Sequence, residues 1–540
     1  MKTPDYSAGI AAFESLARAE VEQGRISGVS VAFVDDQRIV YAQAFGCADK
    51  AKGIPATTNT VYRAGSISKL FTAVATMQLA EQGKLDIDAP VTKFNRAFRI
   101  VNPFEGTGEV TLRQLMCHRS GMIRESPVGS YFDDSGATVD ETVASLAGCA
   151  LVNPPGAKMR YSNVGVTVVG QTVERVSGLE FEAYQQRHLF GPLGMRSSSF
   201  WLGKSLKPYL SKAYLPVADG KGGFREIEAP QFELGTIPAG NLYTTAADLG
   251  RFLSCLFAEG RTAGGKLLKP DTLKEMFTPQ LTKETNTFGI GFSLGTYRRY
   301  KTIGHGGAVY GFSSTLLAIP SQKIGVVLLN NDDINGGPVR KLTEAALDLL
   351  LEAKTGERFA KEKKSFALAD ATPFTGEFES ESYWASVASG QGKLLANISG
   401  QRMEFIAIGT NRFEAFGRVV HASPVVFEKD AAGRMIGFSL MGQTFRRVDM
   451  KQVRPIPQLW RSYLGSYGKS FIPAIVSERN GHLYVMTENM WDYRLTPVNE
   501  TVFKMPVGMY TDEHLTFEKD AKGRVHGLVL ANVKMQRRSR

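Results

Sequence analysis

The chain has 540 residues, of which 43% are hydrophobic and 22% are charged, and its net charge is +11 at pH 7. This length exceeds what one hydrophobic core usually serves, so about three domains are expected. The lysines and arginines are scattered and form no dense stripe interleaved with aromatic residues, which argues against nucleic acid as a partner.

The N-terminal segment and the cysteines indicate a cytoplasmic protein. The N-terminus has no unbroken apolar core and carries acids early, so we expect no secretory signal. No stretch is apolar over the roughly 18 residues that a membrane helix needs, and we predict no membrane partner. The four cysteines form no close-spaced pair, which is typical of reduced thiols: Cys47, Cys117, Cys149 and Cys255. We predict neither a metal nor a cofactor, and the sequence leaves the oligomeric state open.

The first 355 residues predict an α+β catalytic domain, because helices and strands follow one another in a mixed order. The expected elements are an amphipathic helix in residues 1–23, a β-hairpin of strands 28–34 and 38–45, a helix from Ser66 to about Gln82, mostly helical structure over 84–260, strands 311–319 and 324–329, and a helix over 336–353.

The remainder of the chain has a different texture and contains an internal repeat. A charged linker is expected over 356–372, and short alternating strands with Gly and Asn turns follow it. Phe427-Glu-Lys-Asp-Ala-Ala-Gly-Arg434 recurs as Phe517-Glu-Lys-Asp-Ala-Lys-Gly-Arg524, an offset of 90 residues. We therefore predict two small antiparallel β-barrels, 373–452 and 453–540. They are interpreted as a structural appendage, with the alternative that one barrel limits what enters the catalytic cleft.

The segment Ser66-Ile-Ser-Lys69 opens the predicted helix and carries two chemically useful groups. Residues three apart share one face of a helix, so the hydroxyl and the ammonium are expected side by side. A serine hydroxyl needs a nearby proton acceptor to become a nucleophile, and a lysine packed among apolar neighbours can have its pKa lowered enough to serve. The plainer interpretation of Ser66 is a helix N-cap.

The same spacing occurs a second time, in Ser466-Tyr-Gly-Lys469. This copy lies in a Gly- and Tyr-rich stretch with strand-like flanks, where the two side chains need not meet. We interpret it as a chance match.

Two further motifs favour a catalytic role for Ser66 over that of a helix cap. Tyr161-Ser-Asn163 follows a Pro/Gly loop, and it is the only place where an Asn comes two residues after a Tyr. A phenol near an ammonium can have its pKa lowered and act as a proton shuttle. Asn163 is predicted to hold Lys69 and a substrate amide. A buried, hydrogen-bonded tyrosine in a turn is the alternative.

The third motif is Gly304-His305-Gly-Gly307-Ala308, just before the predicted strand at 311–319. Glycines let a substrate lie close to a strand edge. The backbone N–H of Ala308 can join that of Ser66 in an oxyanion hole. A literal Lys354-Thr-Gly356 also exists, but it lies at a helix end, so we discard it.

In this order, the three motifs resemble the serine β-lactamase and penicillin-binding-protein superfamily, whose signatures are S-x-x-K, Y-x-N, and K-T-G or H-x-G. The likeness is greatest to the branch of class C β-lactamases and D-amino-acid peptidases, and it covers residues from about 10 to 355. It implies an α/β sandwich beside a helical lobe, with the active site between the two. It also assigns Ser66 as nucleophile, Lys69 and Tyr161 as the proton-transfer pair, Asn163 as a positioning residue and His305 as the third-motif residue.

One departure from the family pattern bears on the substrate. His305 stands where β-lactamases have a lysine that binds the carboxylate of the drug, and a neutral imidazole would do so weakly. The resemblance therefore implies a serine hydrolase that acts through an acyl-enzyme on amide bonds of small or unusual linear peptides, including those with D-residues or from linearised cyclic peptides. A carboxylesterase with the same site and a non-catalytic scaffold are the alternatives. A cysteine hydrolase built on Cys117 and His118 is a weaker one, because adjacent helical residues point apart.

Overall fold

The computed structural model describes residues 4–218, 223–284, 286–359, 366–390 and 393–538. These residues divide into two compact units. Of the described residues, the first unit takes those within Met1–Leu215, Glu228–Asp333 and Leu342–Phe359, and the second takes those within Pro216–Ile227, Ile334–Lys341 and Ala360–Arg540. The second unit therefore includes two short segments that precede residue 355. The predicted domain boundaries remain predictions, and residues 360–365 of the predicted linker lie outside the described residues.

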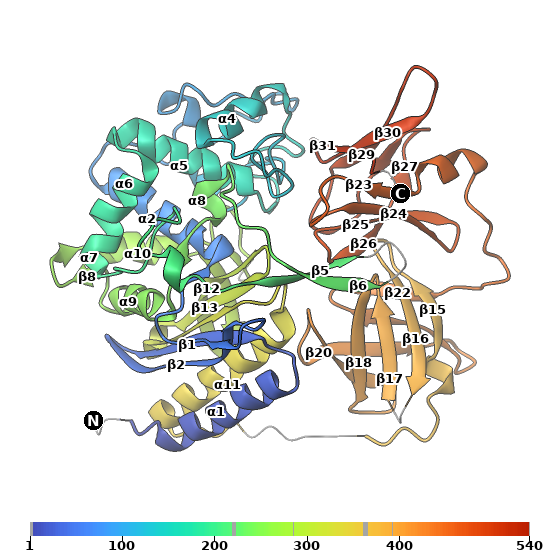
Figure 1. The fold of residues 1–540 in the computed structure, drawn as a ribbon, viewed down its shortest axis with the longest axis horizontal. Coiled ribbons are helices and arrows are strands. Elements are labelled where there is room, and N and C mark those ends of the chain that lie inside the picture. Colours follow the sequence, from blue (N-terminus) through green and yellow to red (C-terminus); the bar gives the residue numbers. More distant parts are fainter. Residues whose placement is uncertain (1–3, 219–222, 285, 360–365, 391–392, 539–540) are drawn as a thin grey trace. The chain divides into compact units, whose positions relative to one another are not determined.

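The first unit is built around an eight-stranded antiparallel sheet with the order β10-β11-β12-β13-β14-β1-β2-β3 (Figure 1). Its strands are β1 (Gly28–Asp35), β2 (Arg38–Asp49), β3 (Ile54–Pro55), β10 (Thr287–Phe288), β11 (Ser293–Tyr297), β12 (Tyr300–Val309), β13 (Phe312–Ile319) and β14 (Ile324–Asn330). The predicted hairpin is β1–β2, and the two later strands are β13 and β14. Every residue of β1 is buried, because the strand lies inside the sheet with helices over both faces.

Helices cover the two faces of this sheet. The terminal helices α1 and α11 lie together on one face, and α9 packs on β1, β2 and β14 (Figure 1). The helices are α1 (Ser7–Glu22), α2 (Ser68–Glu81), α3 (Leu112–Met116), α4 (Val139–Ala144), α5 (Asn163–Ser177), α6 (Phe181–Gln185), α7 (Gly191–Leu193), α8 (Ile237–Gly240), α9 (Ala246–Phe257), α10 (Pro270–Met276) and α11 (Gly336–Thr355). The predicted helical region over 84–260 thus contains most of the short helices.

Short strand pairs complete the first part of the chain: β4 (Tyr62–Arg63) with β7 (Tyr243–Thr244), β5 (Tyr214–Ala218) with β6 (Phe224–Glu228), and β8 (Arg261–Thr262) with β9 (Gly265–Lys266). Helix α2 is buried on nearly every side, from Ser68 to Leu79. It packs against α5 and α8, so the start of α2 lies between the sheet and the helical lobe. This is the arrangement that the family resemblance implied.

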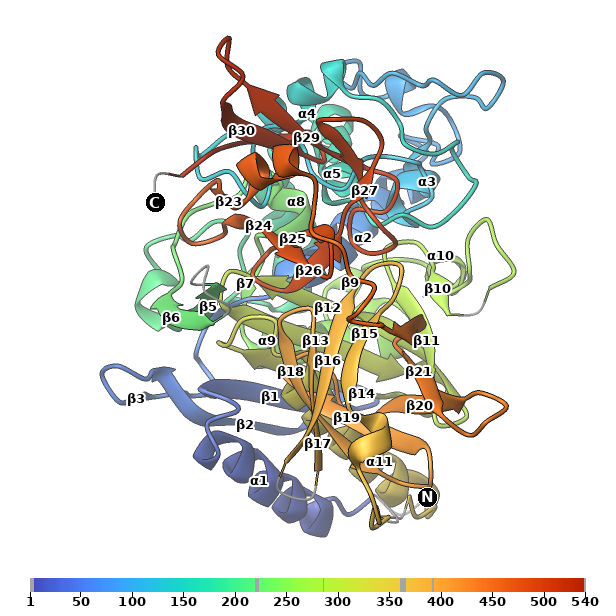
Figure 2. The ribbon, with the colours of Figure 1, turned by 90° about the vertical axis from the view of Figure 1, so that its right-hand side faces the viewer.

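The second unit contains a closed antiparallel barrel, as predicted. Its strands are β15 (Gly376–Glu379), β16 (Trp384–Gly390), β17 (Lys393–Ile398), β18 (Gln401–Ala407), β19 (Arg412–Gly417), β20 (Ser423–Lys429), β21 (Met435–Leu440) and β22 (Gln443–Arg447) (Figure 2). Alternate residues point inward, so β18 has the burial pattern of a strand with one face in a core. Phe378, Phe427 and Phe438 pack against one another inside the barrel.

The last segment forms two sheets of four and five strands. They comprise β23 (Gly465–Tyr467), β24 (Ala474–Arg479), β25 (His482–Thr487), β26 (Trp491–Arg494), β27 (Thr496–Pro497), β28 (Val502–Lys504), β29 (His514–Lys519), β30 (Val525–Leu530) and β31 (Val533–Gln536). A bridge between Tyr467 and Arg537 joins the outer strands of the two sheets. Of the two predicted barrels, the first is therefore a closed ladder, whereas the described residues of the second form two sheets that one bridge joins.

The sequence repeat coincides with a structural repeat. Strand pair β20–β21 shifts register between Glu428 and Lys429, and pair β29–β30 shifts register between Glu518 and Lys519. A β-bulge of this kind adds one residue to one strand of a pair. Both copies therefore carry the same irregularity, 90 residues apart in the chain.

Candidate active site

Ser66 lies on a 3₁₀ turn, Gly65–Ile67, that leads directly into α2. Gly65 has a φ of +54°, and a side chain there would place its Cβ 2.8 Å from the amide nitrogen of Ala308. Only glycine allows this approach between the turn and β12. No side chain caps this turn or α2, so the helix-cap interpretation of Ser66 is wrong. The Ser66 side chain is partly exposed among buried neighbours.

Lys69 lies one turn further along and is 1% exposed. Its Nζ lies 3.0 Å from Ser66 Oγ, 2.8 Å from Asn163 Oδ1 and 2.7 Å from the carbonyl oxygen of Ala239. Burial lowers the pKa of Lys69 well below its ordinary value, and the positive charge of Arg124 lowers it further. The sequence-based expectation of a base beside the serine, with a lowered pKa, thus has the required geometry.

Tyr161 lies near the same serine, and its hydroxyl interacts with the Ser66 side chain. The centre of its ring lies 4.8 Å from Lys69 Nζ and 4.2 Å from the centre of the His118 ring. Burial raises the pKa of Tyr161, and the interaction with Ser66 and the charge of Arg124, which both lower it, offset only part of that rise. The prediction of a lowered phenol pKa is therefore wrong, because the loss of solvent outweighs the nearby cations.

The third motif lies within β12 itself, whereas the sequence suggested a position before the strand. A side chain at Gly307 would place its Cβ 2.0 Å from the carbonyl oxygen of Ala64, so the close contact requires glycine. His305 is 7% exposed, and its Nδ1 lies 2.5 Å from the carbonyl oxygen of Gly306. Burial, aided by the charge of Lys69, lowers the pKa of His305 to about 4. The imidazole is therefore neutral at physiological pH.

The register of β12 exposes the N–H of Ala308. Val309 and Phe312 flank a two-residue turn to β13, an arrangement in which they form a hydrogen-bonded pair. Hydrogen-bonded and non-hydrogen-bonded pairs alternate along the ladder, so Ala308 directs its N–H away from β13. Strand β11 pairs with β12 only over residues 300–304 and does not cover this edge. The N–H of Ala308 thus has the direction that the predicted oxyanion hole with the N–H of Ser66 requires.

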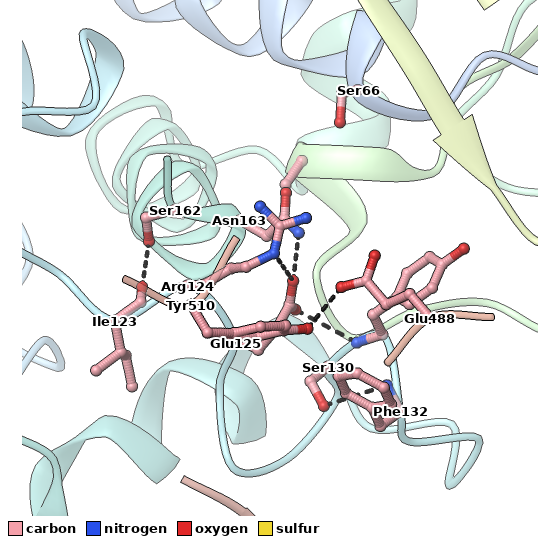
Figure 3. Close-up of polar contacts among 12 residues, drawn as sticks. Ser66, Ile123, Arg124, Glu125, Ser130, Phe132, Ser162, Asn163, Glu488 and Tyr510 are labelled. Atoms are coloured by element: carbon pink, nitrogen blue, oxygen red, sulfur yellow. Dashed lines mark hydrogen bonds and ion pairs between the residues drawn. The ribbon is translucent and has the colours of Figure 1, made fainter. Parts of the chain in front are cut away.

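The sequence did not identify Arg124 and Glu125, two residues that contact the predicted site residues. Asn163 donates from Nδ2 to Oε1 of Glu125, and the guanidinium of Arg124 lies 5.4 Å from the centre of the Tyr161 ring. Figure 3 shows Arg124, Glu125 and Asn163 grouped together, with Ser66 above them in the view. Both missed residues lie in a loop without a periodic pattern, and only their tertiary contacts identify them.

The competing candidates do not assemble. Burial raises the pKa of Cys117 to about 11, and His118 Nδ1 accepts a hydrogen bond from the backbone of Ser162, so no Cys–His pair forms. Ser466 lies in strand β23, where residues three apart do not share a face. Lys354, in the discarded Lys-Thr-Gly match, lies on α11 and forms an ion pair with Asp35.

Three general features complete the description. Across the described ranges, no group of three or more His, Cys, Asp or Glu side chains could hold a metal ion. Within those ranges, each helix is too short or too polar to span a lipid bilayer. The four cysteines are free thiols, and three of them are buried.

Known sequences match the first part of the chain. The family profile described as Beta-lactamase matches residues 13–351. "Protein flp" of Staphylococcus aureus (strain MW2) is 24% identical over 332 residues, which is 61% of this chain and 64% of that protein. The chain thus spans less than two thirds of the length of this curated relative.

Solved structures share the fold. The octameric penicillin-binding protein homologue from Pyrococcus abyssi superposes with a TM-score of 0.59 and 22% identity, covering 90% of this chain and 99% of its own. The D-amino acid amidase from Ochrobactrum anthropi SV3, in complex with D-phenylalanine, superposes with a TM-score of 0.54 and 23% identity, covering 65% of this chain and 100% of its own. Since the family profile covers more than half of the sequence, the chain belongs to the Beta-lactamase family.

Proposed function

We propose that this protein is a serine hydrolase that acts through an acyl-enzyme. The observation that carries the proposal is the position of Ser66 Oγ, 3.0 Å from a buried amine and near the phenol of Tyr161. A hydroxyl between a base and a second proton-transfer group is the arrangement that nucleophilic catalysis requires.

The pKa shifts divide the proton-transfer roles between the two partners. In acylation, the neutral amine of Lys69 takes the proton of Ser66 as Oγ attacks the substrate carbonyl, and the N–H groups of Ser66 and Ala308 bind the oxyanion. Tyr161 carries its proton in the resting enzyme. It gives this proton to the departing nitrogen or oxygen and then takes one from the Lys69 ammonium. Water then attacks the acyl-enzyme by the reverse route. General acid–base groups contribute about 10²–10⁴-fold each, and an oxyanion-hole donor about 10²–10³-fold.

For the substrate, we propose amide bonds of small or unusual linear peptides, with D-residue-containing and linearised cyclic peptides as the first class to test. The neutral His305 supports this proposal, because it offers no cation to the carboxylate of a β-lactam. The similarity to a D-amino acid amidase is in line with it. We also propose a cytoplasmic location, which the free thiols support.

Covalent labelling tests the chemistry. We expect a fluorophosphonate probe to add one adduct to Ser66, detected by mass spectrometry of the intact protein and of its peptides, and Ser66→Ala to take none. Ser466→Ala is the matched control and should label like the wild type. A wild-type protein without any adduct would instead favour a non-catalytic scaffold.

Substrate panels then separate the peptidase from its nearest alternative, a carboxylesterase with the same residues. The panel comprises matched D- and L-peptide amides together with p-nitrophenyl esters, and kcat/KM is compared per labelled site. Hydrolysis of amides supports the proposal. Turnover of esters alone, with no product from any peptide, would assign the site to an esterase.

A further inference from the structure

Glu125 is a buried acid next to the catalytic groups, and the mechanism above does not use it. Its side chain is 1% exposed, which is costly for a carboxylate unless partners compensate. The loop that carries it is held against the start of α5: Asn163 donates its N–H to the carbonyl oxygen of Arg124 at 2.9 Å, and Ser162 Oγ donates to that of Ile123 at 2.6 Å (Figure 3). Glu125 is thereby held at a defined place beside Asn163.

The contact between Glu125 and Asn163 determines which way the amide faces. Glu125 forms an ion pair with Arg124, whose Nε lies 3.7 Å from Oε1, and a carboxylate in an ion pair can only accept hydrogen bonds. The Nδ2 group of Asn163 must therefore face Glu125, which leaves Oδ1 facing Lys69 Nζ at 2.8 Å. A flipped amide would place an oxygen against the carboxylate and an NH₂ group against the lysine.

The side on which Asn163 Oδ1 lies determines where the lone pair of a neutral Lys69 points. A neutral amine has two N–H groups and one lone pair. Asn163 Oδ1 and the carbonyl oxygen of Ala239 are both acceptors, so they take the two N–H groups. The lone pair is then left for the third neighbour, Ser66 Oγ at 3.0 Å. With the amide flipped, the NH₂ group of Asn163 would compete for the lone pair.

We propose that Glu125 is a positioning residue, which orients the amide of Asn163 so that Lys69 directs its lone pair at Ser66. The inference rests on the proposed function, since it concerns the base of that reaction. Five titratable or charged side chains surround Lys69: Arg124, Glu125, Tyr161, His118 and His305. Among them Glu125 is the acid, and its charge raises the pKa of Lys69.

Glu125→Gln removes the charge and keeps the size, so that either end of the new amide can face Asn163. We expect kcat to fall about 10-fold to 10²-fold with KM within about twofold, because the defect is in proton transfer. We also expect the acidic limb of the kcat/KM profile to move to lower pH. Rates are expressed per site labelled by fluorophosphonate, so that a loss of folded protein does not count as a loss of rate. Glu259→Gln, on an exposed side chain of the same unit, is the matched control.

A double-variant cycle tests whether Glu125 acts through Asn163. If it does, Glu125→Gln combined with Asn163→Ala is no slower than Asn163→Ala alone. Multiplying defects, or an unchanged kcat per labelled site in Glu125→Gln, would overturn the proposal while leaving the serine hydrolase intact. A wild-type protein that takes no label would overturn both. If Glu125→Gln does not fold, Glu125→Asp replaces it. For this variant we expect a reduced kcat and an acidic limb at the same pH as in the wild type. A kcat that is not reduced would contradict the proposal.

Discussion

The chain contains the pattern Ser-x-x-Lys at residues 66–69 and again at residues 466–469, and only the first copy builds a site. The first lies at the entrance of a buried helix, where Lys69 Nζ reaches Ser66 Oγ. The second begins in a strand of a small sheet, and Lys469 is exposed. Equal spacing therefore has different chemical meaning in the two places. Helical geometry brings the first pair together, and burial lowers the pKa of its lysine.

The comparison predicts the largest difference for the two serines. Ser66→Ala removes the nucleophile and is expected to lower kcat/KM by at least about 10⁴-fold. Ser466→Ala is expected to stay within about twofold of the wild type, because Ser466 lies on a strand and Lys469 is exposed rather than buried. Steady-state rates on the best substrate of the panel give both numbers. A comparable loss in both variants would remove the distinction between the copies.

The two lysines come next. Lys69→Ala should lower kcat by about 10²–10⁴-fold, as expected of a general base, and Tyr161→Phe should lower it by at least about 10²-fold. Lys469→Ala should leave kcat unchanged. Circular dichroism and thermal unfolding check that each variant is folded. If Lys69→Ala retained wild-type kinetics, the amine would not be the base.

The pH dependence sharpens the contrast between a buried and an exposed lysine. The amine of Lys69 acts only when neutral, and burial holds its pKa well below the ordinary value of 10.5. The kcat/KM value should therefore be full above this lowered pKa and fall about tenfold per unit as pH drops below it. A profile that still rises up to about pH 10 would mean an ordinary, exposed lysine amine.

A smaller effect is expected at His305. His305→Lys restores the cation of the family pattern, and we expect about a tenfold gain in the acylation rate by penicillin, since a charged donor strengthens the bond to its carboxylate. His305→Gln, which stays neutral, is the control. Equal acylation by the Lys and Gln variants would show that charge at this position does not select the ligand.

Much of the fold follows from local patterns. The hairpin β1–β2, the helix from the turn at Ser66 through α2, and the final helix α11 follow the periodicities of their segments. Strand β12 was missed because Gly304, Gly306 and Gly307 lower the strand propensity that the pattern needs. Its neighbours in the sheet, not its own residues, make it a strand.

The site residues likewise divide into those that sequence motifs predict and those that only tertiary contacts reveal. The pairing of Ser66 with Lys69 was predictable from their spacing on a helix, and the family resemblance added Tyr161 and Asn163 to it. Glu125 and Arg124 were not predictable, because a loop without periodicity places them and only their contacts with Asn163 and Tyr161 reveal a role. The predicted direction of the Tyr161 pKa shift was wrong for a related reason. A nearby cation can be inferred from sequence, but the depth of burial that outweighs it cannot.

The bulges between Glu428 and Lys429 and between Glu518 and Lys519 bear on the history of the C-terminal unit. An added residue at an equivalent point of two hairpins is more simply inherited than invented twice. The two copies are therefore descendants of one ancestral hairpin, joined in tandem by duplication of a gene segment.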